Sequence, residues 1–106
     1  MLRAVPSKSA TLPKVRMSQA LLDALVAQAS AAGISGSEAV RQLLESYLAE
    51  RCELPAMEAS AHDAFLPPTR VSKQLAAGVR WNAELAGVSV AETVRRVLAS
   101  KLPVGA

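Results

Sequence analysis

Few residues of this 106-residue chain could take part in covalent or metal chemistry. It contains one histidine, His62, and one cysteine, Cys52, and both lie in the same connecting stretch. One cysteine cannot form an internal disulfide or a cysteine-based zinc site. Catalysis needs a converging set of titratable groups, and the sequence has no phosphate-binding glycine loop, metal-ligand cluster or nucleophile motif. We therefore expect no enzymatic activity and no cofactor.

The remaining chemistry is cationic. The formal net charge is +3 and the isoelectric point is about 9.5, which favours a polyanionic partner. Arg16 and Arg70 stand out because each lies two residues before a serine, Ser18 and Ser72 respectively. Taken alone, either arginine could be an ordinary solvated charge. The matched pair favours a shared binding role.

An internal repeat makes the two arginines equivalent. Residues 12–48 align without a gap with residues 66–102, and 15 of the 37 aligned positions are identical. The identities include the Leu-Pro pair, the arginine, the serines and the glycine that interrupt the apolar pattern. Chance similarity between two segments rich in alanine and leucine would not reproduce those positions, so the repeat indicates duplicated structure.

Each copy has the sequence signals of a short strand followed by two helices. The strands are expected at 12–17 and 66–71. The first helix begins at Ser18 or Ser72, residues that favour a helix N-terminus, and ends at a glycine, Gly33 or Gly87. The second helix begins with a Ser-x-x-Glu capping box at 35–38 or 89–92. Apolar residues at helical spacing mark the inner face of the helices.

One copy of about 37 residues buries its apolar faces poorly by itself. We therefore expect a mainly α fold in which both copies form one intertwined globular domain with two short antiparallel strands and four helices. The expected organisation is a flexible basic arm (1–10), a first repeat (11–48), an acidic linker (49–65) and a second repeat (66–102). No segment is apolar enough to span a membrane or to act as a secretory signal, which favours a cytoplasmic location.

These features resemble the ribbon-helix-helix superfamily of Arc and MetJ type. The resemblance is carried by LPKVRMSQALLDAL with GISGSEAVRQLLESYL, and by LPPTRVSKQLAAGV with GVSVAETVRRVLASKL. It covers about 70% of the chain. In this family two strands form a ribbon that enters the DNA major groove. The tandem single-chain form resembles the TraY-type accessory proteins of conjugative plasmids.

The resemblance implies that outward strand residues read bases. Period-two alternation turns Val15, Met17, Thr69 and Val71 inward, and turns Leu12, Lys14, Arg16, Leu66, Pro68 and Arg70 outward. The expected base-reading residues are Lys14, Arg16 and Arg70, because arginine and lysine can bind guanine O6 and N7. The resemblance also implies phosphate binding by the start of each second helix, at Ser35, Gly36, Ser37, Ser89, Val90 and Ala91.

The second strand departs from the family pattern at Pro67-Pro68. Proline cannot donate to a strand ladder, so pairing is expected to begin only after the prolines. Pro68 also occupies the position that Lys14 holds in the first repeat. We therefore expect that the two DNA half-sites need not be identical, a freedom that a homodimer lacks.

The predicted function is sequence-specific binding of double-stranded DNA by a monomer that acts as a pseudo-dimer, with further assembly on DNA left open. The setting would be plasmid or mobile-element DNA processing, with a relaxase as a candidate partner, or transcription regulation. An antitoxin is less favoured, because antitoxins of this family usually carry a toxin-binding tail and only four residues follow the last expected helix. The alternative from another class is a protein-interaction module that uses Trp81 or the acidic linker. Arg41 and Arg95 are expected to pair with carboxylates such as Glu38 and Glu92.

Overall fold

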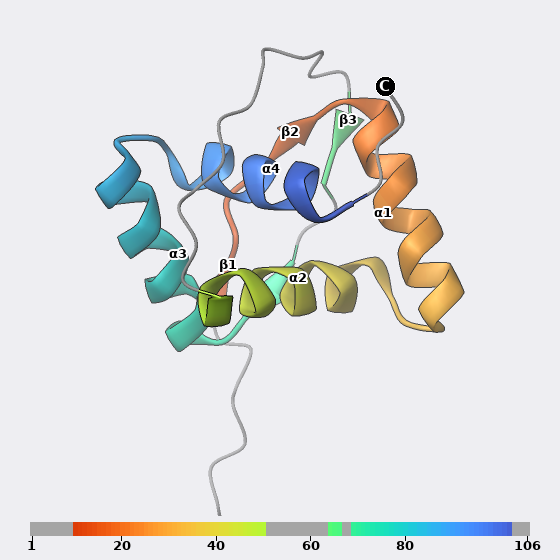
Figure 1. The fold of residues 1–106 in the computed structure, drawn as a ribbon, viewed down its shortest axis with the longest axis horizontal. Helices are drawn as coiled ribbons and strands as arrows, with labels where there is room; N and C mark the ends of the chain where they lie inside the picture. Colours follow the sequence, from red (N-terminus) through yellow and green to blue (C-terminus); the bar gives the residue numbers. More distant parts are fainter. Residues whose placement is uncertain (1–9, 51–63, 67–68, 103–106) are drawn as a thin grey trace, which may run out of the picture.

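The computed structural model describes residues 10–50, 64–66 and 69–102. These residues fold into two copies of a strand, strand, helix, helix unit (Figure 1). The elements are β1 (Ala10–Thr11), β2 (Arg16–Met17), α1 (Gln19–Ala32), α2 (Gly36–Glu50), β3 (Ala64–Phe65), β4 (Arg70–Val71), α3 (Lys73–Ala86) and α4 (Val90–Lys101). The fold is therefore mainly α, with four helices and two short antiparallel strand pairs in the described part of the chain, as predicted.

The helix ends form where the repeat predicts them. A serine hydroxyl accepts the backbone N–H three residues later at the start of every helix, at 3.0 or 3.1 Å, from Ser18, Ser35, Ser72 and Ser89. Gly33 and Gly87 end α1 and α3 at φ 71°, a left-handed conformation that glycine adopts without steric cost. These local signals set both ends of α1 and α3 and the starts of α2 and α4.

The first segments of the two repeats pair as one two-stranded ribbon. β1 pairs antiparallel with β4, and β2 pairs antiparallel with β3. Two further hydrogen bonds of 2.9 Å continue both pairs toward the middle of the ribbon in the same register. One runs from Leu12 N to Thr69 O, and the other from Leu66 N to Val15 O. We use "ribbon" for residues 10–17 paired with 64–66 and 69–71. Because β1 and β3 precede the prolines in sequence, the expectation that pairing begins only after the prolines was wrong.

The expected direction of two ribbon side chains was also wrong. Val15, Met17, Thr69 and Val71 are buried as predicted, but Leu12 and Leu66 are buried too, at 6% exposure each. Pro13 and Lys14 are both exposed, so the alternation shifts by one position between Leu12 and Val15. Strict alternation holds along an unbroken strand, whereas residues 12–15 lie between β1 and β2, and Pro13 has no N–H to donate to a ladder there.

The hydrophobic core is shared by the two repeats. Equivalent residues Leu44 and Leu98 are completely buried, and side chains from the ribbon and all four helices join them. α2 packs against α4, while α1 and α3 lie on opposite sides of this pair (Figure 1). Burying each such leucine or valine stabilises the fold by about 1.5–3 kcal/mol. The core therefore holds the ribbon against the helices.

None of the helices in the described ranges has the length and apolar character needed to cross a membrane.

Candidate nucleic-acid interface

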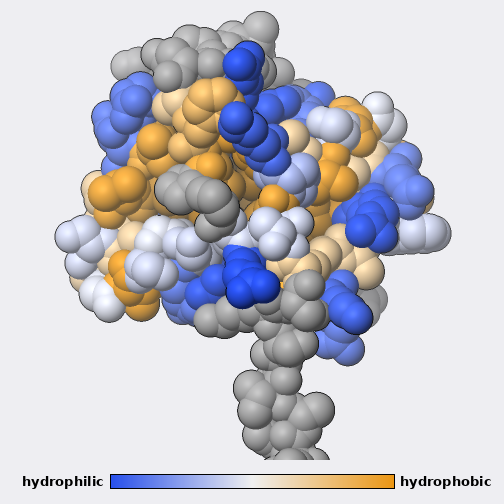
Figure 2. Space-filling model, turned by 180° about the vertical axis from the view of Figure 1, so that it is seen from behind, coloured by the Kyte–Doolittle hydropathy of each residue, from blue (hydrophilic) through white to orange (hydrophobic). Residues whose placement is uncertain are grey.

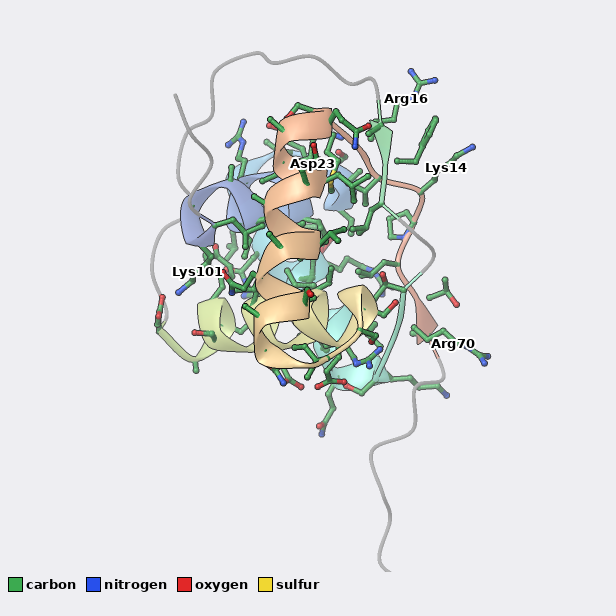
Figure 3. All side chains as sticks on the ribbon, turned by 90° about the vertical axis from the view of Figure 1, so that its right-hand side faces the viewer. Lys14, Arg16, Asp23, Arg70 and Lys101 are labelled. Carbon is green, nitrogen blue, oxygen red and sulfur yellow. The ribbon has the colours of Figure 1, made fainter. Side chains whose placement is uncertain are left out.

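The three predicted base-reading residues lie on one edge of the molecule. Lys14, Arg16 and Arg70 are exposed, and their side chains project from the ribbon away from the helices (Figure 3). Lys14 and Arg16 lie at one end of this edge, and Arg70 lies toward the other. Their strand neighbours Val15, Met17 and Val71 are buried in the core, and this burial turns the alternate side chains of the strands toward solvent. The ribbon thus presents cations to solvent on the face opposite the core.

Two further residues share this outward face. Phe65 is paired with Arg16 across the ribbon and is 43% exposed, while Thr11 is paired with Arg70 and is also exposed. The sequence interpretation missed both, because Phe65 was assigned to the linker and Thr11 preceded the expected strand. Extending the repeat alignment backward would have aligned Ala10 with Ala64 and Thr11 with Phe65 as equivalent positions. This is the signal that could have found them.

The ribbon face is chemically mixed. Viewed from behind the helices α2 and α4, strongly hydrophilic atoms gather toward the top and in the lower middle of the surface, and hydrophobic atoms lie between them (Figure 2). The Lys14 ammonium lies 4.4 Å and the Arg16 guanidinium carbon 5.1 Å from the centroid of the Phe65 ring. Cations at such distances over an aromatic face are attracted by its quadrupole. The aromatic ring therefore helps to place two of the three cations.

The starts of α2 and α4 flank the ribbon. The Arg41 Nη1 of α2 donates a 2.9 Å hydrogen bond to the Arg70 carbonyl oxygen, and the Arg95 Nη1 of α4 donates one of 3.0 Å to the Arg16 carbonyl oxygen. Each second helix is thus tied to the strand of the other repeat. These contacts obey the pseudo-twofold relation of the two copies, and they bring both helix N-termini beside the ribbon.

The first backbone N–H groups of a helix have no acceptor within the helix. In α2 these belong to Gly36 and Ser37, which follow the exposed cap Ser35. In α4 they belong to Val90 and Ala91, which follow the exposed cap Ser89. A helix N-terminus carries partial positive charge and suits an anion. All six residues proposed for phosphate binding therefore lie at helix starts next to the ribbon.

Glutamates hold the two tethering arginines in place. Glu38 Oε1 accepts Arg41 Nη2 at 2.5 Å, and Glu92 Oε1 accepts Arg95 Nη2 at 2.6 Å. These pairs confirm the carboxylate contacts expected for both arginines, while the bonds to the ribbon carbonyls were not foreseen. Arg96 Nε adds a 2.8 Å bond to Glu92 Oε2.

Partial burial by itself raises the pKa of Glu92. Hydrogen bonds and charge from Arg96 and Arg95 outweigh that effect, so the pKa of Glu92 is lowered from its ordinary value of 4.5. The carboxylate is therefore ionised at neutral pH, and the α4 tether to the ribbon stays charged.

α3 carries an exposed apolar pair. Trp81 is 62% exposed and Leu85 is 69% exposed. They are four residues apart in one helix and so share a face. His62 and Cys52 lie outside the described residues, as does most of the acidic linker.

Comparison with known proteins gives no relative for this chain. No protein-family model matches the sequence, and neither the curated proteins nor the solved structures contain a significant match.

Proposed function

We propose that this protein binds double-stranded DNA sequence-specifically, with the ribbon in the major groove. The observation that carries the proposal is the set of outward cations Lys14, Arg16 and Arg70 on one exposed ribbon edge. A two-stranded ribbon fits the width of the major groove, and arginine forms bidentate hydrogen bonds with guanine there. The resemblance to ribbon-helix-helix proteins supports the same interpretation.

The flanking helix starts would position the protein on the duplex. Backbone N–H groups at the starts of α2 and α4 are suited to bind phosphate oxygens on either side of the groove. The tethers Arg41 to the Arg70 carbonyl and Arg95 to the Arg16 carbonyl keep those helix starts in a fixed relation to the ribbon. Base contacts would then select the DNA sequence, and phosphate contacts would fix the position of the protein along the duplex.

The biological setting rests on the resemblance alone. It favours an accessory DNA-processing protein of a plasmid or mobile element that acts in the cytoplasm, with a relaxase as a candidate partner. A transcriptional regulator is the second setting. In both, one chain supplies the two halves that a homodimer would otherwise provide.

The test is selection of binding sequences from random duplexes, followed by fluorescence-anisotropy titration at two salt concentrations. We expect enrichment of a short motif and an affinity that falls as salt rises. Arg16→Ala combined with Arg70→Ala should weaken specific binding by roughly 1–3 kcal/mol per lost base contact. Arg80→Ala removes one exposed arginine of α3. It is the control matched in charge to each single substitution, Arg16→Ala or Arg70→Ala, and it should leave the motif unchanged. Binding without any enriched motif would contradict sequence-specific readout.

The alternative function is a protein-interaction module. The exposed pair Trp81 and Leu85 favours it, because large apolar side chains on one helix face are typical of partner surfaces. If that function holds instead, no duplex binds at low salt, and replacement of Trp81 by alanine abolishes partner binding without changing stability.

A further inference from the structure

The two ends of the ribbon present different chemistry in equivalent places. At one end Arg16 faces Phe65 across the ribbon, and at the other Arg70 faces Thr11. The arginines are equivalent in the repeat, and so are Phe65 and Thr11. An aromatic ring therefore stands at one end where a small hydroxyl side chain stands at the other. This difference breaks the symmetry of the proposed reading face.

Phe65 is exposed on the same face as the cations. It keeps 43% of its surface open to solvent, although its neighbours Ala64 and Leu66 are buried at 6% each. The alternation shows that the ring is directed outward by the strand rather than displaced from the core. Lys14 and Arg16 lie over the ring, at 4.4 and 5.1 Å from its centroid. The ring and two cations thus form one composite surface, which we name the Phe65 end.

A matching base edge exists in the major groove. Thymine is distinguished there by its C5-methyl group, and phenylalanine is among the residues that contact that methyl. The lysine and the arginine beside the ring suit the O6 and N7 acceptors of guanine. At the Thr11 end the side chain offers a hydroxyl group, which can contact several bases, and one methyl group that is much smaller than the phenyl ring of Phe65.

We propose that Phe65 contacts a thymine methyl group in the half-site read by Arg16, and thereby makes the two half-sites unequal. The inference rests on the proposed DNA-binding function and extends it, since it names a specificity-determining residue and the base edge it reads. The binding site is then non-palindromic, and the chain binds it in one orientation. That orientation places the Trp81 face of α3 on a defined side of the site.

The experiment is a uracil scan of the sequence selected by the wild-type protein. Each thymine is replaced in turn by deoxyuridine, which removes only the C5-methyl group, and the affinity is measured by fluorescence anisotropy. Loss of one buried methyl-sized group should weaken binding about fourfold (about 0.8 kcal/mol). We expect this loss in one half-site only, namely the half-site whose base preference is relaxed by Arg16→Ala and retained in Arg70→Ala.

The variants Phe65→Ala and Thr11→Ala make a matched pair. Phe65→Ala should bind the thymine and uracil duplexes equally well, whereas Thr11→Ala should keep the wild-type sensitivity. Phe65→Thr should shift the selected motif toward a palindrome, because positions 11 and 65 then carry the same residue, although Lys14 and Pro68 still differ. Uniform tolerance of uracil by the wild type, or a uracil effect that persists in Phe65→Ala, would overturn the inference while leaving DNA binding intact. Absence of all duplex binding would refute the proposed function itself.

Discussion

Arg95 and Arg16 are joined across the two repeats by a hydrogen bond of 3.0 Å from the Arg95 guanidinium to the Arg16 carbonyl oxygen. The same guanidinium binds Glu92 through two of its nitrogens. The Arg95 side chain is only 12% exposed. It therefore connects α4 to the strand that carries a proposed base-reading residue, and it does so largely away from solvent.

The first prediction concerns this tether. Arg95→Met should destabilise the fold by about 1.5–3 kcal/mol, because it removes charge-assisted hydrogen bonds to Glu92 and to a ribbon carbonyl. It should also weaken the proposed DNA binding, since the backbone carbonyl of Arg16 then loses its hydrogen bond from α4. The matched control is Arg96→Met, which loses a contact to the same glutamate but none to the ribbon, and which should cost about 0–1 kcal/mol.

Urea unfolding and anisotropy titration measure the two effects. Equal losses of stability in the Arg95 and Arg96 variants would show that the bond to the Arg16 carbonyl contributes nothing beyond the surface ion pairs.

The second prediction is a pH dependence of stability. Because the folded-state pKa of Glu92 lies below its ordinary value of 4.5, its ionised form stabilises the native state above that pH, and the contribution is lost as the pH falls further through the folded-state pKa. Glu92→Gln removes the charge at every pH. The stability gap between wild type and Glu92→Gln should therefore be greatest near neutral pH and close in acid.

Urea unfolding of both proteins at a series of pH values from neutral to acid checks this expectation. A gap that stays constant into acid would mean that the loss in Glu92→Gln does not arise from the carboxylate charge.

The third prediction concerns the left-handed helix ends. Gly33→Ala and Gly87→Ala should each destabilise by about 1–2 kcal/mol, because a Cβ is strained at φ 71° even though no neighbouring atom lies within 4 Å. Gly36→Ala is the control: its Cβ also meets nothing within 4 Å, and its φ lies outside the left-handed region. Thermal unfolding should separate the control from the other two variants, and equal melting temperatures would contradict the assigned strain.

The sequence predicts the features that depend on local chemistry. Serine at a helix start and glycine at a helix end act through neighbouring backbone groups, so Ser18 and Gly33 mark the same helix in the sequence and in the structure. Since the repeat supplies each signal twice, the shared four-helix core could also be predicted, because one copy has too little apolar surface to bury alone.

The remaining features depend on contacts between the repeats. The burial of Leu12 and Leu66 follows from a ladder interrupted beside Pro13, which simple alternation does not anticipate. The bonds of Arg41 and Arg95 to ribbon carbonyls span 29 and 79 positions in the chain. Helical and strand periodicity relate residues only a few positions apart, so they could not predict these two hydrogen bonds.

The fourth prediction concerns a close contact between α2 and α3, where Gly78 faces Leu48. A Cβ placed on Gly78 would lie 2.8 Å from Leu48 Cδ1. That atom is the end of a flexible side chain, which can move aside. Gly78→Ala should therefore stay within about 1 kcal/mol of wild type, since the better helix propensity of alanine offsets the adjustment. Gly78→Leu cannot be accommodated in this way and should destabilise by about 1–3 kcal/mol.

A double-mutant cycle identifies the contact responsible. Leu48→Ala alone should be destabilising, because it removes apolar surface packed against the core. Combined with Gly78→Leu it should recover part of the loss, since the new leucine occupies the space that Leu48 leaves. The two substitutions would then be non-additive by at least about 0.5 kcal/mol. Additive losses in urea unfolding would mean that the close approach of α2 and α3 at Gly78 does not limit which residue that position accepts.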